Sequence, residues 1–584
     1  MGVAGAIDAA LPELPLLLQQ LLSVDFPQYV WPASWALLGV MVLWHMIRRE
    51  EEGQRYKVPA ARYPEKHEIL ERPSIKKSGT TSIQCYAPAT GQLLGSINPS
   101  IPASIDRAIA AAQTAQETWA RTTFPQRRAV LRALLRHVLD NQEEICRAAC
   151  LDSGKTMVDA ELGEIMVTAE KLRWTIRHGE AALAPSRRPT NLLMAYKRNE
   201  VRYEPLGVVA ALVSWNYPFH NFISPVISAL FAGNGVVVKV SEQVAWSAAY
   251  FTAVARGALV ACGHDPALVQ TVVCWPEMAG YLTAHPGIKH ITFIGSRAVC
   301  QKVAASAAKP LTPLVAELGG KDAAVVLDSV GEGDLERVIA TLMRGTFQAS
   351  GQNCIGIERI VAAPRVYTRL VEMLEPRVRA LSLGPEGDVG GMISDANFGK
   401  LEGLVGDAIR KGARVLVGGK RYTHPDYPRR SALARLWSLC GLEGKAEDLL
   451  ALANAPGYGL GSSVWGSERD PVLKQVVSGL QAGMVAVNDF ASFAATHMPF
   501  GGVRGSGYGR FYGEEGLKGL CNIKSVCEDR FGWLGIRTSI PRPIRYPVPS
   551  QERSWRFAKG VVEVGYATTV KGKLAGLLGM MKNM

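Results

Sequence analysis

Two short segments near the middle of the chain carry residue types that could perform covalent chemistry. Glu317 opens the segment Glu-Leu-Gly-Gly-Lys, and Cys354, 37 positions later, closes Ser-Gly-Gln-Asn-Cys. A carboxylate can act as a general base, and a cysteine thiolate can attack an electrophile if its site is accessible and electrostatically stabilised. Gly351 favours a turn rather than a packed core before the cysteine. The pair predicts nucleophilic catalysis, with a buried cysteine and a solvated glutamate as the ordinary alternatives.

Short apolar runs rich in Val and Ile surround the first of these segments and alternate with helical stretches. The runs cover residues 207–213, 236–240, 269–273, 290–294 and 323–327. Such alternation is typical of a parallel sheet covered by helices on both faces, which binds its ligands at the carboxyl edge of the strands. Residues 131–139 place Leu and Val at i, i+3, i+4, i+7 and i+8, which predicts an amphipathic helix packed on the core.

Polar residues directly after the predicted strands are candidates for cofactor binding. The candidates are Trp215 and Asn216 after one strand, Lys239 and Glu242 after a second, and Gly295 and Ser296 after a third. A lysine near phosphates and an acidic side chain on a ribose suit a dinucleotide, and a Gly-Ser pair that opens a helix exposes backbone N–H groups to an anion. Each of these residues has an ordinary alternative as a strand-end or turn residue.

Composition and charge narrow the class of protein. The 584 residues are 48% apolar, which suits two or three globular domains, and the ten cysteines include no CxxC pair for a zinc site. Scattered cysteines fit a reduced compartment with neither a disulfide framework nor a bound metal. The net charge is +13, of which +8 lies in residues 530–584. The remaining chain is close to balanced and shows no nucleic-acid-binding motif, so no nucleic-acid partner is expected.

Both ends of the chain predict contact with a membrane. Residues 29–47 carry no formal charge apart from His45, and these 19 residues are long enough to cross a hydrocarbon core. Arg48 and Arg49 follow, whereas no Lys or Arg precedes the segment, so a single-pass helix would leave the body in the cytosol, with the endoplasmic reticulum as the expected membrane. A buried or interfacial helix is the alternative. The basic tail 530–584 mixes basic and apolar residues as a peripheral membrane segment would.

Six segments resemble motifs of the aldehyde dehydrogenase superfamily and occur in that family's order. They are residues 213–219, 238–242, 293–296, 317–321, 351–354 and 499–510, spanning roughly residues 80 to 530. The apolar N-terminal segment, Lys-Val-Ser-Glu at 239–242 and the stretch 540–547 resemble the membrane-anchored branch of the superfamily. That branch includes the fungal meiotic sister-chromatid recombination-type proteins and their plant relatives.

The resemblance implies an α/β fold with a Rossmann-type coenzyme-binding domain, an α/β catalytic domain and a small oligomerisation hairpin, preceded by a transmembrane helix. The implied parts are an N-terminal tail (1–28), a transmembrane helix (29–47), a linker (48–78), the coenzyme-binding domain (79–185 and 207–317), the catalytic domain (318–510), oligomerisation strands (186–206 and 520–528) and a basic tail (530–584). The implied assembly is a homodimer.

The resemblance also implies a reaction, the oxidation of an aldehyde to a carboxylic acid. Cys354 would attack the aldehyde carbonyl to form a thiohemiacetal, and the Asn216 side chain with the Cys354 N–H would stabilise the oxyanion. After oxidation to a thioester, Glu317 would activate the hydrolytic water. Lipid-derived aldehydes are a candidate substrate class, because the predicted anchor places the body beside a bilayer.

The implied coenzyme is NAD. Lys239 and Glu242 resemble the family's ribose-binding pair. Further expected contacts come from Trp215, Gly295, Ser296 and Leu318. An acidic residue at the ribose favours a free 2′-hydroxyl, and thus NAD, while the neighbouring lysine keeps NADP possible.

One coenzyme segment of the family is missing from the chain. In the family, a stretch ending in Glu-Glu-x-Phe-Gly-Pro supplies a glutamate to the nicotinamide ribose, and this chain contains no Phe-Gly-Pro. Residues 421–440 stand in its place. A changed loop and an erroneous gene model are two explanations, and a catalytically impaired membrane scaffold is the functional alternative, because hydride transfer depends on the placement of the nicotinamide ring.

Overall fold

The predicted parallel sheet is present in the computed structural model, which describes residues 52–64, 68–419, 421–423, 431–433, 439–441 and 445–584. The strand order is β17-β9-β8-β5-β6-β7, and only β17 runs antiparallel to its neighbour. The strands are β5 (Val208–Leu212), β6 (Gly235–Val240), β7 (Val269–Val273), β8 (Ile288–Ile294), β9 (Leu314–Glu317) and β17 (Gly507–Tyr508). Four of the five predicted apolar runs therefore lie in this sheet, which confirms the α/β fold class.

Helices cover both faces of this sheet because successive side chains of a strand point to opposite sides. Val209 and Ala211 of β5 pack against α5, α8, α9 and α10, whereas Val208 and Ala210 pack against α4, α11 and α12. These helices are α4 (Pro102–Trp119), α5 (Phe124–Asp140), α8 (Val167–Leu183), α9 (Pro218–Phe231), α10 (Ala248–Ala261), α11 (Pro276–Thr283) and α12 (Arg297–Ala307). The amphipathic helix predicted over 131–139 is part of α5.

The fifth predicted run, which the apolar pattern groups with the other four but the resemblance places in the segment 318–510, belongs to a second sheet. Strand β10 pairs in parallel with β11 and β15, in the order β14-β11-β10-β15-β16. A turn through Gly319, whose φ of +71° suits glycine, takes the chain from β9 into the second sheet. The strands are β10 (Ala323–Val326), β11 (Arg359–Ala362), β14 (Leu439–Gly441), β15 (Gly461–Trp465) and β16 (Met484–Val487). An apolar run shows that a strand is buried, but it does not show which sheet the strand joins.

The second sheet is also covered on both faces. Ala324 and Val326 of β10 pack with α13 (Leu335–Phe347) and α14 (Pro364–Arg379), and the alternate residues pack with α16 (Ala446–Asn454) and α17 (Pro471–Gly479). Smaller elements are β1 (Ile83–Tyr86), β2 (Leu93–Ile97), α6 (Gln142–Ser153), α7 (Met157–Ala160), α15 (Asp395–Arg410), α18 (Ser492–Ala495) and α19 (Gly513–Lys518). A π-helical turn, η1 (Glu161–Met166), joins α7 to α8.

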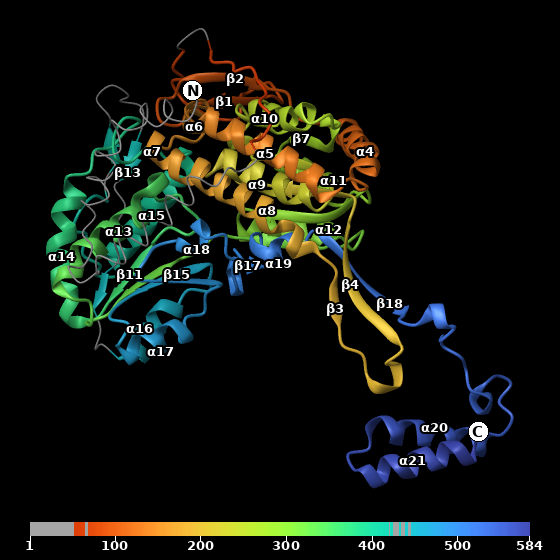
Figure 1. Cartoon of the computed structure of the whole chain (residues 1–584). Coiled ribbons are helices and arrows are strands. Elements are labelled where there is room, and N and C mark those ends of the chain that lie inside the picture. The colour runs from red at the N-terminus through yellow and green to blue at the C-terminus, as the bar shows by residue number, and fades with distance from the viewer. Residues whose placement is uncertain (1–51, 65–67, 420, 424–430, 434–438, 442–444) are drawn as a thin grey trace, which may run out of the picture. The chain divides into compact units, whose positions relative to one another are not determined.

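A three-stranded antiparallel sheet and a pair of helices complete the described chain (Figure 1). The sheet has the order β18-β4-β3, with β3 (Ser186–Arg188), β4 (Lys197–Pro205) and β18 (Cys521–Asp529). These strands lie in the two segments that the resemblance assigns to oligomerisation. In the basic tail, α20 (Gln551–Tyr566) and α21 (Val570–Lys582) pack closely. A Cβ on Gly560 would lie only 2.7 Å from the Gly576 carbonyl oxygen, so the close approach requires glycine at this position.

The segment predicted to cross a membrane, residues 29–47, lies outside the described residues, as does the N-terminal tail 1–28. Among the helices that are described, none is both long enough and apolar enough to span a bilayer. Most of the segment 421–440 is likewise outside the described part, although β14 adds an edge strand beside β11.

Candidate active site

Glu317 and Cys354 line the same cavity, whose volume is about 380 Å³. Glu317 is the last residue of β9 and thus stands at the carboxyl edge of the first sheet. Cys354 reaches the cavity from beside the second sheet, after α13 and the short turn η6 (Gln348–Gly351). The ionised Glu317 carboxylate is close enough to raise the pKa of the Cys354 thiol. The two groups singled out in the sequence are therefore neighbours in the fold.

A strained turn presents Cys354 to the cavity. Ala349, Ser350 and Gly351 all have left-handed backbone conformations, with φ values of +53°, +57° and +63°. The left-handed conformation costs a residue with a side chain about 1 kcal/mol or more of conformational free energy, so the surrounding structure must hold the turn in place. Asp159 does so by accepting a hydrogen bond of 2.9 Å from the Ala349 N–H, and its carboxylate also lies 3.0 Å from Arg344.

Burial controls the protonation of both reactive groups. It raises the pKa of Cys354 well above the ordinary thiol value, with further increases from the carboxylates of Glu317 and Asp322. The thiol is therefore protonated at neutral pH until a base removes its proton. Burial also raises the pKa of Glu317 to about 7, although the Gly319 N–H donates a hydrogen bond of 2.8 Å to its carboxylate. A carboxyl group with this pKa can gain and lose a proton near neutral pH.

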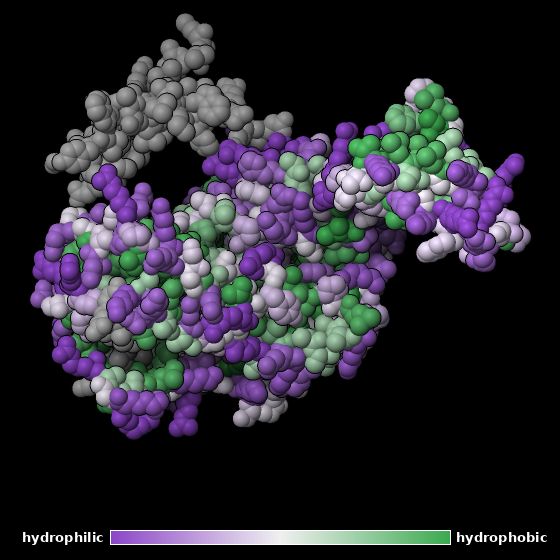
Figure 2. All heavy atoms as spheres, turned by 90° about the horizontal axis from the view of Figure 1, so that it is seen from below, coloured by the Kyte–Doolittle hydropathy of each residue, from purple (hydrophilic) through white to green (hydrophobic). Residues whose placement is uncertain are grey.

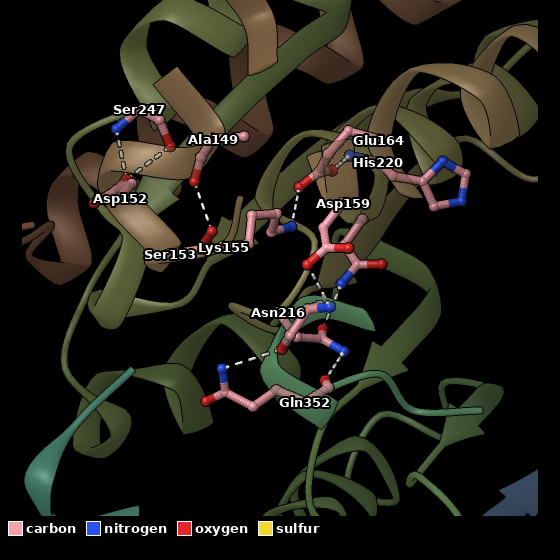
Figure 3. A network of polar contacts seen from close by, with 12 residues as sticks. Ala149, Asp152, Ser153, Lys155, Asp159, Glu164, Asn216, His220, Ser247 and Gln352 are labelled. Carbon is pink, nitrogen blue, oxygen red and sulfur yellow. Dashed lines mark hydrogen bonds and ion pairs between the residues drawn. The ribbon is translucent and has the colours of Figure 1, made fainter. Parts of the chain in front are cut away.

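The Asn216 amide is aimed at the cysteine segment from the loop after β5 (Figure 3). Its Nδ2 donates a hydrogen bond of 3.1 Å to the Gln352 carbonyl oxygen, two residues before Cys354. Its Oδ1 accepts hydrogen bonds from Ser214 Oγ at 2.7 Å and from Asn221 Nδ2 at 3.1 Å. Because Oδ1 is occupied in this way, the NH₂ group points toward the backbone just before Cys354, and its second N–H is the candidate donor to an oxyanion.

A buried ion pair supports the start of α9, directly after Asn216 and Tyr217 (Figure 3). Lys155 Nζ and Glu164 Oε1 are 2.5 Å apart, and both side chains are almost fully buried. The other oxygen of Glu164 accepts a hydrogen bond of 2.7 Å from the His220 N–H, and the Lys155 ammonium lies 4.2 Å from the centre of the Tyr217 ring. The pair therefore fixes the helix that follows the oxyanion-binding loop.

Sequence patterns did not identify Lys155, Asp159 and Glu164 as parts of the site. The three residues lie within ten positions, around α7 and η1, and their spacing matches no motif. The only structural signal is the π-helical turn that contains Glu164, since such turns occur often at functional sites.

The predicted coenzyme residues lie at the carboxyl edge of the same sheet. Lys239 ends β6 together with Val240, and its Nζ forms an ion pair of 3.0 Å with Glu242 Oε2. Gly295 and Ser296 follow β8 and open α12, where the Ser296 side chain makes no capping hydrogen bond. The first N–H groups of α12 thus have no side-chain acceptor, which fits a dinucleotide phosphate, and the Lys–Glu pair fits a ribose.

Two further predicted residues border this edge. Trp215 is half-buried in the loop after β5, beside Asn216. The Leu318 N–H, directly after Glu317, donates a hydrogen bond of 3.0 Å to the Ser506 carbonyl oxygen. In the described part of the chain, no group of three or more His, Cys, Asp or Glu residues is placed to hold a metal ion.

Comparisons with known proteins agree with this geometry. The model of the aldehyde dehydrogenase family matches residues 75–431 and 443–526. An aldehyde dehydrogenase-like protein of Saccharomyces cerevisiae is 47% identical over 86% of this chain and 82% of its own length, and one of Schizosaccharomyces pombe is 45% identical over 84% and 97%. A succinate-semialdehyde dehydrogenase [NADP(+)] of Mycobacterium leprae is 29% identical over 76% and 99%.

Solved structures of aldehyde dehydrogenases are also similar to this chain. An aldehyde dehydrogenase of Mycobacterium tuberculosis, solved in complex with NAD⁺, has a TM-score of 0.70 at 27% identity and covers 81% of this chain and 98% of its own. The expected nicotinamide coenzyme and the class of oxidoreductase are thereby confirmed, as is the resemblance to the fungal branch. The catalytic and coenzyme segments meet at one sheet edge, and the family model matches most of the length of the chain. The chain therefore belongs to the aldehyde dehydrogenase family.

Proposed function

We propose that the protein oxidises aldehydes to carboxylic acids through covalent chemistry at Cys354. The observation that carries this proposal is the shared cavity, in which the thiol, the Glu317 carboxyl group and the Asn216 amide converge. The Cys354 sulfur forms a bond to the aldehyde carbon, and the resulting oxyanion receives hydrogen bonds from Asn216 Nδ2 and the Cys354 N–H. When bound, NAD⁺ accepts the hydride, and Ser296, Lys239 and Glu242 would hold it.

Glu317 completes the cycle in this proposal. As a carboxylate it takes a proton from water, the water oxygen bonds to the acyl carbon, the carbon–sulfur bond breaks, and the carboxylic acid leaves. Its position beside the thiol also lets it accept the proton of Cys354 before the attack. That proton passes to solvent before hydrolysis, and the proton taken from water then returns to the Cys354 sulfur, which regenerates both groups. Glu242 supports NAD over NADP as the coenzyme, because an acidic side chain at the ribose disfavours a 2′-phosphate.

The Glu317 assignment predicts a pH profile for the wild type and a large loss in Glu317→Gln. Since the pKa of Glu317 is raised to about 7, its base form is lost as the pH falls through that value, and the steady-state rate should fall with it. The variant should lose about 100-fold or more of the rate, the usual contribution of a general base. NADH formation from hexanal, measured between about pH 6 and about pH 9, tests both expectations.

A matched control is Glu336→Gln, which removes an exposed carboxylate that pairs with Arg377 on the surface. This variant should keep the wild-type profile. A Glu317→Gln variant with an unchanged rate would remove Glu317 from the mechanism.

The second candidate function is a catalytically impaired scaffold, which the missing Glu-Glu-x-Phe-Gly-Pro stretch favours. Residues 432–442 also lie outside the match to the family model. The NADH assay separates the two functions when it is combined with a titration of NAD⁺ followed by protein fluorescence. A folded protein that neither turns over hexanal nor responds to NAD⁺ would be the scaffold.

We further propose that the protein acts at a membrane of the endoplasmic reticulum, with its body in the cytosol, and that lipid-derived aldehydes are among its substrates. The uncharged residues 29–47 support the anchor, and the +8 charge of residues 530–584 supports contact with anionic lipid. A homodimer is the proposed assembly, supported by β18, an edge strand whose Ile523 is exposed.

The two C-terminal helices are the proposed contact with the bilayer surface. Apolar residues gather on this part of the chain (Figure 2), and the exposed ones recur at helical spacing along each helix. The exposed members are Trp555, Val562 and Tyr566 on α20 and Val570, Leu574, Leu577, Leu578 and Met581 on α21. Basic residues flank them, so the pair has the composition of an interfacial segment that binds anionic lipid.

Lipid contact predicts slower hydrogen–deuterium exchange of α20 and α21 on vesicles that contain phosphatidylserine. The full-length protein should show this protection on phosphatidylserine vesicles and lose most of it on neutral ones, because the basic side chains require anionic headgroups. Leu577→Glu should abolish the protection, whereas Leu404→Glu, which changes another exposed leucine on α15, should not. Equal exchange on both kinds of vesicle would contradict the proposed contact.

A further inference from the structure

Lys171 of α8 lines the cavity that holds Cys354, although its side chain is almost fully buried. Its Nζ donates a hydrogen bond of 2.9 Å to Ser224 Oγ and lies 4.7 Å from the centre of the Tyr512 ring. Within the residues that the structure describes, no carboxylate forms an ion pair with it. An ammonium group has three N–H donors, so Lys171 is a cation in a cavity wall with unused hydrogen-bonding capacity.

The wall around Lys171 is polar on one side only. His220, Ser224 and Ser228 occupy one face of α9 at i, i+4 and i+8, all three are buried, and all three line the cavity. This stripe stands out because the rest of α9 is almost wholly apolar. The Tyr512 hydroxyl is hydrogen-bonded to His220 Nε2. Lys171 is thus the charged member of a group of hydroxyl and imidazole donors.

A buried ammonium without a counter-ion is unfavourable, because removal from water costs several kcal/mol that only a partner of opposite charge recovers. Lys155 has such a partner in Glu164, and Lys171 has none among the described residues. Burial accordingly lowers the pKa of Lys171 to about 7. An anionic ligand in the cavity would supply the missing partner and keep the amine protonated.

We propose that Lys171, assisted by Ser224, binds a carboxylate at the far end of the aldehyde substrate, so that the preferred substrates are oxo-carboxylic acids. The assignment rests on the proposed aldehyde oxidation and names its substrate class. Tyr512 contacts the Lys171 ammonium and lines the same cavity as Cys354. Because that cavity has a volume of about 380 Å³, a substrate that reaches both side chains is small, which suits a short aliphatic chain.

The apolar wall of the cavity fits the chain between the two ends. Leu162 and Met166 of η1 and Val167 of α8 line it and offer methyl and methylene contacts but no charge. A neutral aldehyde of the same length would fill this space and leave the Lys171 ammonium without a partner. The site therefore selects for the acid group.

Matched substrates test the proposal: 5-oxopentanoate and pentanal differ only in the carboxylate. The wild type should show a kcat/KM for 5-oxopentanoate at least about tenfold above that for pentanal, since a hydrogen bond to a charged group discriminates by this order. Lys171→Met should lose that preference, because methionine keeps the packing of the stem and removes only the charge. Equal preference in wild type and variant would overturn the proposal.

Stability measurements distinguish ligand binding from a structural role. Lys171→Met should unfold at a higher temperature than the wild type, because it removes an unpaired buried charge. A lysine with a purely structural role would instead make the variant less stable. Glutarate, which cannot be oxidised, should raise the unfolding temperature of the wild type and leave that of Lys171→Met unchanged.

The proposed aldehyde oxidation and the proposed carboxylate site can each fail without the other. Protection by glutarate in a protein that oxidises neither aldehyde would support the carboxylate site and contradict the proposed activity. Oxidation of pentanal without protection by glutarate, and without preference for 5-oxopentanoate, would support the activity and overturn the carboxylate site.

Discussion

Cys354→Ala is expected to reduce NADH formation from hexanal by about 10⁴-fold or more, to the background rate. Alanine removes the sulfur that forms the bond to the aldehyde carbon, and no other cysteine is among the residues that line the cavity in the described structure. The effect is large because the remaining groups assist a covalent step and cannot replace it. The measurement is NADH fluorescence at saturating NAD⁺.

The control for this prediction is Cys262→Ala, which changes a half-buried cysteine at the end of α10. Its rate should remain within about twofold of the wild type, as for substitutions away from the reacting atoms. Cys354→Ala should also bind NAD⁺ with unchanged affinity, because the predicted coenzyme residues belong to other segments. Equal rates in the wild type and in Cys354→Ala would end the proposal of covalent catalysis.

Local patterns in the sequence predicted the part of the site that lies on the first sheet. Strands buried on both faces appear as continuous apolar runs, and the residues directly after them must share one edge of a parallel sheet. Asn216 and Lys239 lie at that edge for this reason, whereas Glu317 ends β9, a strand that the apolar runs did not predict. Cys354 was singled out by its residue type and its glycine turn, but it follows α13 and η6 beside the second sheet, and no rule of strand order connects it to Glu317.

Long-range packing of charged side chains could not be predicted in the same way. Lys171 contacts Tyr512 although the two residues are far apart in the sequence. The residues that flank a lysine in the sequence do not show whether its side chain faces a cavity or water. The apolar pattern could not separate β10 from the strands of the first sheet for a related reason, because both sheets bury Val and Ile equally well. A signal was present on α9, where the buried polar stripe of His220, Ser224 and Ser228 follows helical spacing within an apolar helix.

The two buried lysines of the site illustrate how the same residue type serves different purposes. Lys155 is matched by Glu164 and belongs to the framework that holds α9, whereas Lys171 has no carboxylate partner in the described chain and faces the cavity. Opposite effects on stability are therefore expected when either lysine is replaced by methionine. The contrast follows from pairing alone, since both side chains are similarly buried.

The ion pair between Lys155 and Glu164 offers the largest expected effect on stability. Lys155→Met is expected to lower the free energy of unfolding by about 3–5 kcal/mol, because it leaves the Glu164 carboxylate buried without its cation. The pair between Lys321 and Glu358 is a matched control. Its charged atoms are also 2.5 Å apart, but the two side chains are 45% and 25% exposed. Lys321→Met should cost at most about 1 kcal/mol, since water screens an exposed pair.

Urea unfolding of the two single variants measures both values, and the double variant Lys155→Met, Glu164→Met separates pairing from packing. Because the double variant leaves no unpaired charge, it should be more stable than Lys155→Met alone. Its oxidation rate should still fall, because the His220 N–H loses the Glu164 oxygen that fixes α9 behind the Asn216 loop. Equal losses in Lys155→Met and Lys321→Met would show that burial does not control the contribution of the ion pair, and would remove Lys155 and Glu164 from the framework of the site.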